Sequence, residues 1–189
     1  IGARSTIGSS ITEKLAKDET VDQVVAISRE GLPQRTEKGA KVKSISCNYS
    51  EESIRGICES LKSTEGSITQ VIICNGILHT DRIFPEKRLE DISIATVSEV
   101  MHINTIIPLL WLANIGPLLK SRQTCRVAIL SARVGSISDN RSGGWYAYRA
   151  SKAALNMLIK TAAIEFRRRA PNVKLIAFHP GTTDTKLSK

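Results

Sequence analysis

The residues that most clearly suggest a chemical reaction are Tyr148 and Lys152, a phenol and an ammonium four positions apart. On a helix this spacing places both side chains on one face. A phenol with an ordinary pKa of about 10 exchanges protons poorly at neutral pH, but a neighbouring lysine charge stabilises the phenolate and lowers that pKa. The pair therefore predicts a general acid and base acting on a carbonyl or an alcohol. The alternative is that both are ordinary side chains on a helix surface.

A second candidate site is a turn that leads into a predicted helix at the start of the chain, made by Gly2, Arg4, Ser5, Ile7 and Gly8. Glycine lets the backbone approach a phosphate, and a helix N-terminus offers unpaired N–H groups and the positive end of a dipole. The turn therefore predicts a phosphate site. Two glycines at a helix start also suit an ordinary strand-to-helix turn.

The elements that must position these residues alternate regularly along the chain. Short β-branched runs predict strands at 24–27, 42–46, 71–74, 126–130 and 173–178, and amphipathic stretches predict helices after Gly8 and at 51–61, 92–120 and 148–169. This alternation indicates parallel βαβ units, and continuous apolar strands indicate a sheet covered on both faces. We therefore expect one α/β domain over residues 1–189, a Rossmann-type doubly wound parallel sheet in three α/β/α layers. We expect it to lack the start of its first strand and a C-terminal substrate region.

In such a sheet the ligand binds at the carboxyl ends of the strands, and the end of the second strand reads the adenosine ribose. An acidic residue there accepts a hydrogen bond from a ribose 2′-OH, whereas an arginine suits a 2′-phosphate. Ser28 and Arg29 occupy this position, the first acid is Glu30, and Arg4 in the neighbouring turn adds a second cation. The pattern favours NADP(H) over NAD(H), with solvent-exposed loop arginines as the alternative.

These ordered motifs resemble those of the short-chain dehydrogenase/reductase family, and most closely its C-factor-like and sniffer-type carbonyl reductase branch. The resemblance extends over essentially the whole chain. Residues 1–8 resemble the TGxxxGxG turn, 74–76 the NNAG segment, 143–152 the YxxxK segment and 180–185 the PGxxxT turn. Asn104, a polar residue within a long apolar helix pattern, matches the family's helix asparagine.

The resemblance implies hydride transfer between NADPH and a carbonyl carbon, with Tyr148 as the proton donor. Lys152 would lower the pKa of that tyrosine and bind the nicotinamide ribose, and Asn104 would connect the lysine to solvent through a water molecule. Asn48 stands where an aspartate of the family contacts the adenine. The complete expected set of cofactor-binding residues is Gly2, Arg4, Ser5, Ile7, Gly8, Ser28, Arg29, Asn48, Asn75, Gly76, Tyr148, Lys152, Pro180, Gly181, Thr183 and Thr185.

One departure from the family pattern concerns the catalytic serine, which stands three residues before a glycine in the family. Here that position is Ala132, and Ser131 is one residue away, which on a strand means the opposite face. Ser136 in the following loop is the candidate substitute, and we include it among the catalytic residues. The other outcomes are a weak enzyme, a substrate that supplies its own polarisation, or a protein without turnover.

Composition narrows the classes of partner. Lys and Arg number 27 against 18 Asp and Glu, which gives a net charge of +9, but the charges are scattered and only 4% of residues are aromatic. A base-stacking surface is therefore not expected, and charge alone supports the weakest hypothesis, a nucleic-acid-binding protein. We expect neither nucleic acid nor a membrane as a partner, since no apolar run reaches the roughly 18 residues of a spanning helix.

The four cysteines stand neither in a CxxC pair nor at metal-ligand spacing, so we expect buried reduced thiols, no metal site and a cytoplasmic location. The first hypothesis is an NADP(H)-dependent oxidoreductase with a small carbonyl or alcohol substrate. The second, motivated by Ala132 and the C-factor resemblance, is a cofactor-binding regulatory or cell-cell signalling protein. The resemblance also implies a homodimer or homotetramer built on the helices around Asn104 and Tyr148.

Overall fold

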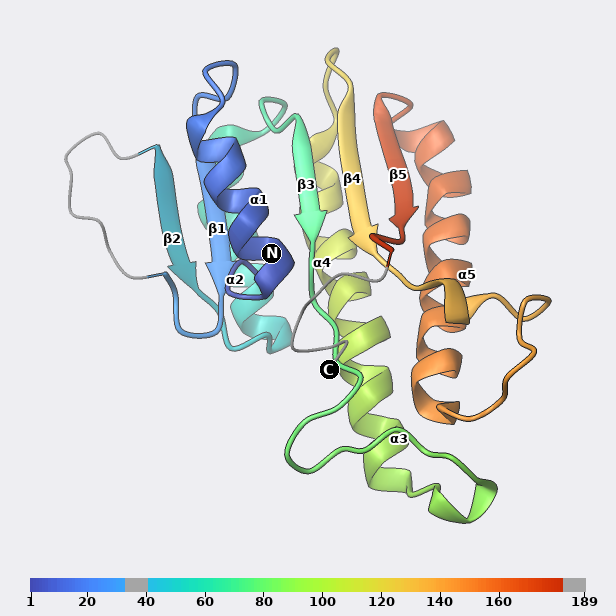
Figure 1. The fold of residues 1–189 in the computed structure, drawn as a ribbon. Helices are drawn as coiled ribbons and strands as arrows, with labels where there is room; N and C mark the ends of the chain where they lie inside the picture. The colour runs from blue at the N-terminus through green and yellow to red at the C-terminus, as the bar shows by residue number, and fades with distance from the viewer. Residues whose placement is uncertain (33–40, 182–189) are drawn as a thin grey trace.

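The computed structural model describes residues 1–32 and 41–181 of the chain. Its parallel strands follow the predicted apolar runs closely and are β1 (Val24–Ser28), β2 (Val42–Ser46), β3 (Gln70–Ile73), β4 (Cys125–Leu130) and β5 (Val173–Phe178). Strand β1 pairs with β2, and β4 lies between β3 and β5. All strands point the same way, so their carboxyl ends share one edge of the sheet, at the bottom of Figure 1.

The first residues of the chain join the two groups of strands into one layer. The backbone of Ile1 donates to Ile72 of β3 at 2.8 Å and accepts from the N–H of Cys74 at 2.9 Å. On the other side, the N–H groups of Gly2 and Ala3 donate to the carbonyl of Ile27 in β1 at 2.8 and 3.0 Å. The order across the layer is therefore β2, β1, residues 1–3, β3, β4 and β5.

Helices cover both faces of this layer, which confirms the expected doubly wound α/β fold. Helix α1 (Thr6–Lys17) packs on β1 on one face, and α2 (Glu51–Ser60), α4 (Ile107–Ile115) and α5 (Tyr146–Arg169) lie side by side on the other. Serines cap the first two helices, because the Oγ of Ser5 accepts from Gly8 and that of Ser50 accepts from Ser53.

The helical stretch predicted at 92–120 is long and apolar. Helix α3 (Ile94–Met101), a π-helical segment (His102–Ile106), α4 and a 3-10 turn (Gly116–Leu119) run end to end, and this stretch is long and apolar enough to cross a membrane by length and composition. No uninterrupted apolar run within it reaches that length, since Glu99 and Asn104 lie inside it. Its largest side chain, Trp111, is fully buried, and α4 packs between α2 and α5. These contacts are those of a core helix.

All four cysteines are buried free thiols, as expected, and they are Cys47, Cys58, Cys74 and Cys125. Burial raises the pKa of the Cys58 and Cys125 thiols to about 11, which keeps them protonated at neutral pH. They serve as small apolar side chains in the core.

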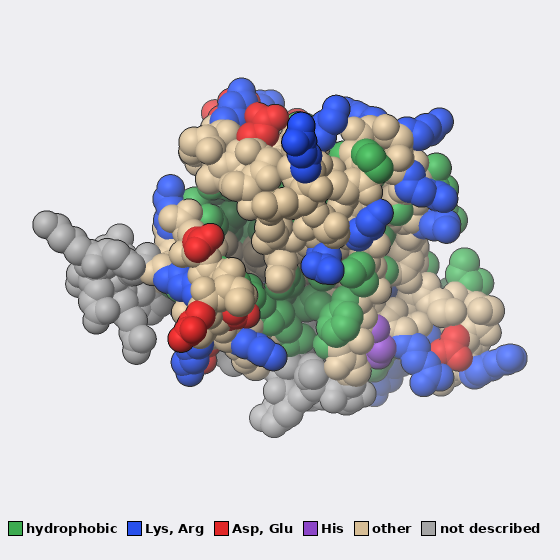
Figure 2. Space-filling view, turned by 90° about the horizontal axis from the view of Figure 1, so that it is seen from above, with side chains coloured by type: hydrophobic (Ala, Val, Ile, Leu, Met, Phe, Trp, Pro, Cys, Tyr) green, Lys and Arg blue, Asp and Glu red, His purple; other side chains and the backbone are tan. Residues whose placement is uncertain are grey.

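The surface charge is dispersed at the end of the molecule where the strands begin. Figure 2 shows Lys and Arg side chains spread around this face, with acidic and apolar side chains between them. A continuous basic stripe of the kind that follows a nucleic-acid backbone is not formed on this face of the described residues.

Candidate active site

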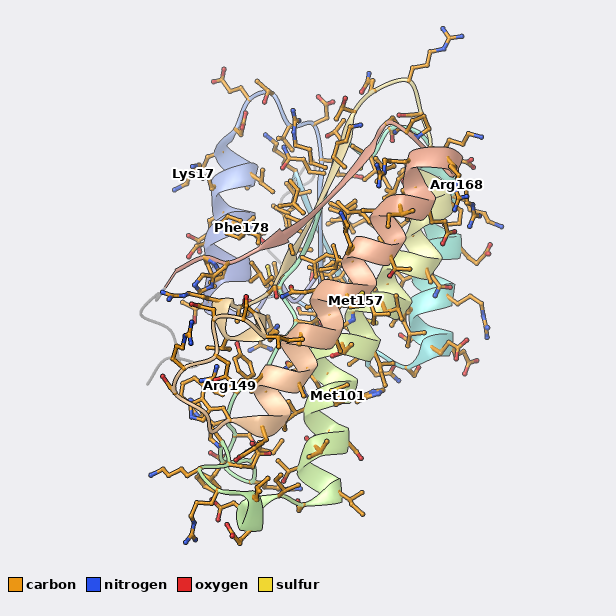
Figure 3. The ribbon with its side chains drawn as sticks, turned by 90° about the vertical axis from the view of Figure 1, so that its right-hand side faces the viewer. Lys17, Met101, Arg149, Met157, Arg168 and Phe178 are labelled. Atoms are coloured by element: carbon orange, nitrogen blue, oxygen red, sulfur yellow. The ribbon has the colours of Figure 1, made fainter. Side chains whose placement is uncertain are left out.

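Tyr148 and Lys152 lie one turn apart on α5, and both side chains are buried, with exposed fractions of 8% and 3%. The Nζ of Lys152 lies 5.9 Å from the centroid of the Tyr148 ring and donates a 3.0 Å hydrogen bond to the carbonyl of Leu130. Leu130 is the last residue of β4, so the strand end holds the ammonium beside the phenol. Figure 3 shows α5 running beside the sheet from Arg149, next to this pair, to Arg168 at its far end.

Burial moves both pKa values toward the neutral forms. It raises the pKa of Tyr148 above its ordinary value, and it lowers the pKa of Lys152 to about 8. The expected lowering of the tyrosine pKa by the lysine is therefore wrong for this structure, because loss of water outweighs the ammonium at this separation. Tyr148 is held in its protonated form at neutral pH, which is the form that can donate a proton.

Asn104 lies in the π-helical segment and is fully buried. Its Oδ1 accepts from the N–H of Ile77 at 2.7 Å, and its Nδ2 donates to the carbonyl of Ile77 at 2.9 Å and to the Oγ of Ser151 at 3.0 Å. The asparagine thus ties the chain after β3 to the helix that carries the pair. A widened π turn is frequent at functional sites, and here it directs the amide inward.

Glycine contacts connect the phosphate-type turn to this pair. A Cβ on Gly2 would lie 3.0 Å from the carbonyl carbon of Cys74 and 3.1 Å from the N of Asn75. A Cβ on Gly76, one residue further, would lie 3.3 Å from the Nζ of Lys152 and 3.4 Å from the Oδ1 of Asn104. The turn, the segment after β3 and the lysine therefore belong to one continuous site, and Gly76 keeps the space beside the two polar groups free of a side chain.

The serine region has one hydroxyl that is already engaged. Ser131 donates its hydroxyl to the Oδ1 of Asn156 on α5 at 2.6 Å. Ala132 follows it and carries no polar atom. The hydroxyl of Ser136 lies 3.4 Å from that of Ser138, a long contact that leaves it able to turn toward another partner.

The turn at the start of the chain has the structural features of an anion-binding site. Gly2 has a φ of +78°, which only glycine adopts readily, and a Cβ on Gly8 would lie 2.4 Å from the Gly2 carbonyl oxygen. Both positions therefore require glycine. Arg4, Ser5 and Ile7 surround the start of α1, where unpaired N–H groups and the helix dipole favour an anion.

At the end of β1 the structure separates the two predicted arginines. Arg4 forms an ion pair with Glu30, with both side chains exposed. Arg29 is also exposed, and it follows Ser28, whose buried hydroxyl has no hydrogen-bond partner among the described residues. The unpartnered hydroxyl fits a polar ligand at this strand end, and the Glu30 carboxylate already offsets the charge of Arg4.

The ends of β2 and β3 supply further polar groups. The Oδ1 of Asn48 accepts from the N–H of Ser50 at 2.9 Å, so the Nδ2 donor is the group that this amide can offer a ligand. The buried Oδ1 of Asn75 has no hydrogen-bond partner among the described residues. Together with Ser28 it gives two orphaned polar atoms at strand ends on either side of residues 1–3, which is the pattern expected where a nucleotide binds.

Beyond β5 the predicted set is only partly described. Pro180 and Gly181 follow the end of β5, with Gly181 at a φ of +80°. Thr183 and Thr185 lie outside the described residues.

Sequence reasoning missed several residues of this site. Ser151 bridges the site by bonding Asn104 and the Tyr148 carbonyl, at 3.0 and 2.8 Å. Gly135 packs on Lys152, since a Cβ on it would lie 2.8 Å from the lysine carbonyl carbon. Glu86 contacts the start of α5 from far away in the chain. Of these three residues, only Gly135 could have been identified from the sequence, because it is the glycine three residues after Ala132, the position of the family's catalytic serine.

The chain matches a known protein family over its whole length. A sequence model described as short chain dehydrogenase matches residues 1–189. The chain belongs to the short chain dehydrogenase family. The fold of this family member is also that of solved relatives: the NADPH-bound carbonyl reductase from chicken fatty liver has a TM-score of 0.80 at 23% identity, covering 100% of this chain and 80% of that one. The carbonyl reductase Sniffer of D. melanogaster has a TM-score of 0.81 at 17% identity, covering 99% and 81%.

Two curated relatives are similar to this family member in sequence. The 1-hydroxy-2-glutathionyl-2-methyl-3-butene dehydrogenase of Rhodococcus sp. (strain AD45) is 29% identical over 191 residues, covering 100% of this chain and 78% of the relative. The C-signal protein of Myxococcus xanthus is 34% identical over 99 residues, covering 52% of this chain and 58% of the relative. The expected resemblance to the C-factor-like and sniffer-type branch is confirmed at the level of family and fold.

Proposed function

We propose that this family member is an NADP(H)-dependent oxidoreductase that transfers a hydride between the nicotinamide and a carbonyl or alcohol substrate. The observation that carries the proposal is the continuous site from the Gly2 turn through Gly76 to Lys152 and Tyr148. A glycine turn at a helix start and a buried phenol lie at one edge of a parallel sheet, where ligands of such sheets bind, and this supports the proposal.

The residues present fit a dinucleotide. The turn at the start of α1 would hold the pyrophosphate, and the orphaned atoms of Ser28 and Asn75 would gain partners. Lys152 would bind the nicotinamide ribose, and the Pro180-Gly181 turn would lie beside the nicotinamide. The bound cofactor supplies or accepts the hydride.

In the direction of reduction, Tyr148 donates its phenolic proton to the substrate oxygen. Its raised pKa keeps that proton in place at neutral pH, and the Lys152 ammonium stabilises the phenolate that remains. A lysine pKa of about 8 makes this group able to pass a proton back to the tyrosine. Asn104 holds the chain after β3 beside the lysine, and a water molecule in the space left by Gly76 would complete the path to solvent.

The preference for NADP(H) follows from Arg29 at the end of β1. Its guanidinium can bond a 2′-phosphate in a bidentate manner, and the Arg4–Glu30 pair lies beside it. The competing arrangement is a Glu30 carboxylate that accepts from a 2′-OH, which would favour NAD(H).

Ser136 is our candidate for the hydroxyl that polarises the substrate oxygen in place of Ala132. Its long contact to Ser138 leaves it able to turn toward a substrate. Without such a donor the transition state loses part of its stabilisation, which is worth about 10²–10³-fold in kcat for one oxyanion-hole donor in other enzymes.

Oxidation of NADPH, followed by absorbance over a panel of aldehydes, ketones and quinones, tests the function. We expect turnover of at least one carbonyl class. Tight NADPH binding with every substrate inert would contradict the enzyme assignment.

That second outcome would favour the alternative, a cofactor-binding regulatory or cell-cell signalling protein. Two observations support it: Ala132 lacks a hydroxyl, and the chain is similar to the C-signal protein over 52% of its length. Both functions would use the same nucleotide site, so only turnover separates them. For either function we propose a cytoplasmic location, in keeping with four reduced thiols.

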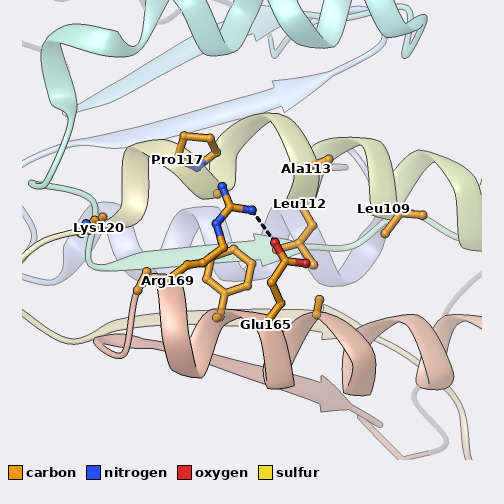
Figure 4. A pocket seen from close by; sticks show the side chains of 11 residues that line it. Leu109, Leu112, Ala113, Pro117, Lys120, Glu165 and Arg169 are labelled. Carbon is orange, nitrogen blue, oxygen red and sulfur yellow. Dashed lines mark hydrogen bonds and ion pairs between the residues drawn. The ribbon is translucent and has the colours of Figure 1, made fainter.

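We also propose a homodimer or homotetramer formed through α4 and α5. Figure 4 shows an apolar groove of about 440 Å³ between these helices, with the Arg169–Glu165 ion pair at its edge. Its residues lie at the far end of α5 from Tyr148, so it is separate from the catalytic pair. Light scattering should give a mass of two or four chains, and an Ala113→Glu variant should shift it to one. A monomer in the native protein would refute this arrangement.

A further inference from the structure

The start of α5 is held by a residue from a distant segment, Glu86. Its side chain is 3% exposed, and its Oε2 accepts a hydrogen bond from the N–H of Ala147 at 3.2 Å. Its backbone carbonyl accepts a second bond from the N–H of Trp145 at 2.5 Å. Trp145 is the N-cap of the helix and Ala147 lies in its first turn. One residue therefore satisfies two N–H groups at the helix start, across a sequence separation of 61 residues for the side-chain bond.

The chain before α5 needs this support because its backbone is left-handed at three successive residues. Gly143, Gly144 and Trp145 have φ values of 63°, 64° and 55°. This conformation is unfavourable for a residue with a side chain such as tryptophan. Trp145 also makes no side-chain cap, and the first turn of α5 contains no acidic residue. The carboxylate of Glu86 supplies the missing cap and suits the positive end of the helix dipole.

The turn is also held from its other side. Arg149 donates from Nε to the carbonyl of Gly144 at 2.9 Å and from Nη2 to the carbonyl of Gly143 at 3.0 Å. The ring of Trp145 meets the ring of Tyr148 edge-on, with centroids 6.3 Å apart and planes at 77°. A movement of the left-handed turn would therefore act directly on the ring of the proton donor.

The carboxylate of Glu86 is poorly suited to a packing role. Its Oε1 is buried and has no hydrogen-bond partner among the described residues. Burying an unpaired carboxylate oxygen is unfavourable, and an apolar side chain of similar size would fill the space without that penalty. What an apolar residue could not do is accept the hydrogen bond of Ala147.

We propose that Glu86 is a positioning residue for Tyr148. Its backbone and carboxylate fix the left-handed turn and the first turn of α5, and these fix the phenol against the substrate position. The inference rests on the proposed function in taking Tyr148 as the proton donor. The contacts of Glu86 with the helix start do not depend on that function.

Kinetics of Glu86→Ala and Glu86→Gln test the role. Loss of the acceptor in Glu86→Ala should lower kcat about 10-fold or more while the NADPH Kd stays unchanged, because a misplacement of 1 Å can lower a rate by about 10²-fold. Glu86→Gln keeps an oxygen that accepts from Ala147 and should stay within about threefold of the native kcat. Glu90→Ala, at an exposed glutamate of the same segment, is the matched control and should behave as the native protein.

A fluorescence measurement that needs no turnover tests the role of Glu86 separately from the proposed oxidoreductase function. In a Trp111→Phe background, the fluorescence of Trp145 should shift in Glu86→Ala and return in Glu86→Gln. If Glu86→Ala does not fold, Glu86→Asp, whose shorter side chain cannot reach Ala147, takes its place in both measurements. Native kcat in the Ala or Asp variant, or a Gln variant as impaired as these, would overturn the role. If no carbonyl is turned over, the proposed function fails, and unchanged fluorescence would then refute the positioning contact as well.

Discussion

The two ends of the site are built in different ways. At the nucleotide end the side-chain contacts lie at or near the surface: the Oγ of Ser5 caps α1 by bonding Gly8, three residues away, and the Arg4–Glu30 pair lies in solvent. At the catalytic end the contacts are buried and distant in sequence, since Asn104 bonds Ser151 across 47 residues and Glu86 bonds Ala147 across 61.

Because of this difference, we expect changes at the nucleotide end to alter cofactor affinity and changes at the catalytic end to alter turnover. A local turn forms from its own glycines and cap, so changing a side chain there alters what the turn binds and leaves the core intact. The catalytic pair is held by the packing of β4, the π-helical segment and α5, so changing it alters proton transfer and stability together. Substitutions at the two ends test this division, and those that remove a catalytic group should have the larger effects.

The largest effect should come from Tyr148→Phe. Removing the proton donor should lower kcat by about 10²–10⁴-fold, the usual contribution of a general acid, with little change in the NADPH Kd. Tyr146→Phe is the matched control, because this tyrosine is exposed and has Ala150 one turn later. Steady-state kinetics and a binding titration of both variants check it, and an active Tyr148→Phe variant would remove that phenol from the mechanism.

Lys152→Met should stabilise the protein without cofactor, although it removes a catalytic group. Burial lowers the lysine pKa from 10.5 to about 8, so the charged form is disfavoured in the folded state. The unfavourable free energy of burying this charge applies in full below pH 8. It disappears as the pH rises toward 10.5, because Lys152 loses its proton at a lower pH in the folded protein than in the unfolded one. We expect a gain of about 2 kcal/mol at pH 7 and a smaller gain at pH 10.

Denaturant unfolding at the two pH values measures this gain, with Lys160→Met, an exposed lysine of the same helix, as the control. A gain that is equal at both pH values would mean that the lysine charge is not the cause.

Ala132→Ser restores a hydroxyl at the position where the sequence departs from the family pattern. Because we propose that Ser136 supplies part of this stabilisation, we expect kcat to rise only about 10-fold, a fraction of the roughly 10²–10³-fold that one such donor contributes elsewhere. Ser131→Ala is the control, because its hydroxyl bonds Asn156 and should not affect turnover directly. If Ser136 already supplies the donor, Ala132→Ser will have no effect and Ser136→Ala will lower kcat instead.

The smallest effect belongs to the nucleotide end. Arg29→Ala should weaken NADPH by about 10-fold, as expected for the loss of a charge-assisted hydrogen bond, and leave NADH nearly unchanged. Arg168→Ala, at the far end of α5, controls for loss of net charge. Titrations with both nucleotides decide the outcome, and equal losses for NADPH and NADH would mean that Arg29 does not contact the 2′-phosphate.

Much of the fold could be predicted because it depends on local patterns. The apolar runs located the strands to within about a residue. The start of α5 could not be predicted in this way. The helix begins at Tyr146, two residues earlier than expected, because Glu86 caps it from a distant segment.

The features of the candidate site likewise fall into those that local sequence predicted and those that it could not. Residue types and spacing were enough to propose Tyr148, Lys152 and the glycine turn, and to notice Ala132. They could not give the direction of the tyrosine pKa shift, because that depends on how much water the packed helix and strand exclude.

The order of strands and helices, the phosphate-type turn and the pairing of a phenol with an ammonium could be predicted from local patterns, because these depend on neighbours within one or two helical turns. The protonation of that pair, the partners of Asn104 and the support of α5 by Glu86 depend instead on the tertiary structure. Burial and hydrogen bonds across 27 to 61 residues exist only once the chain has folded.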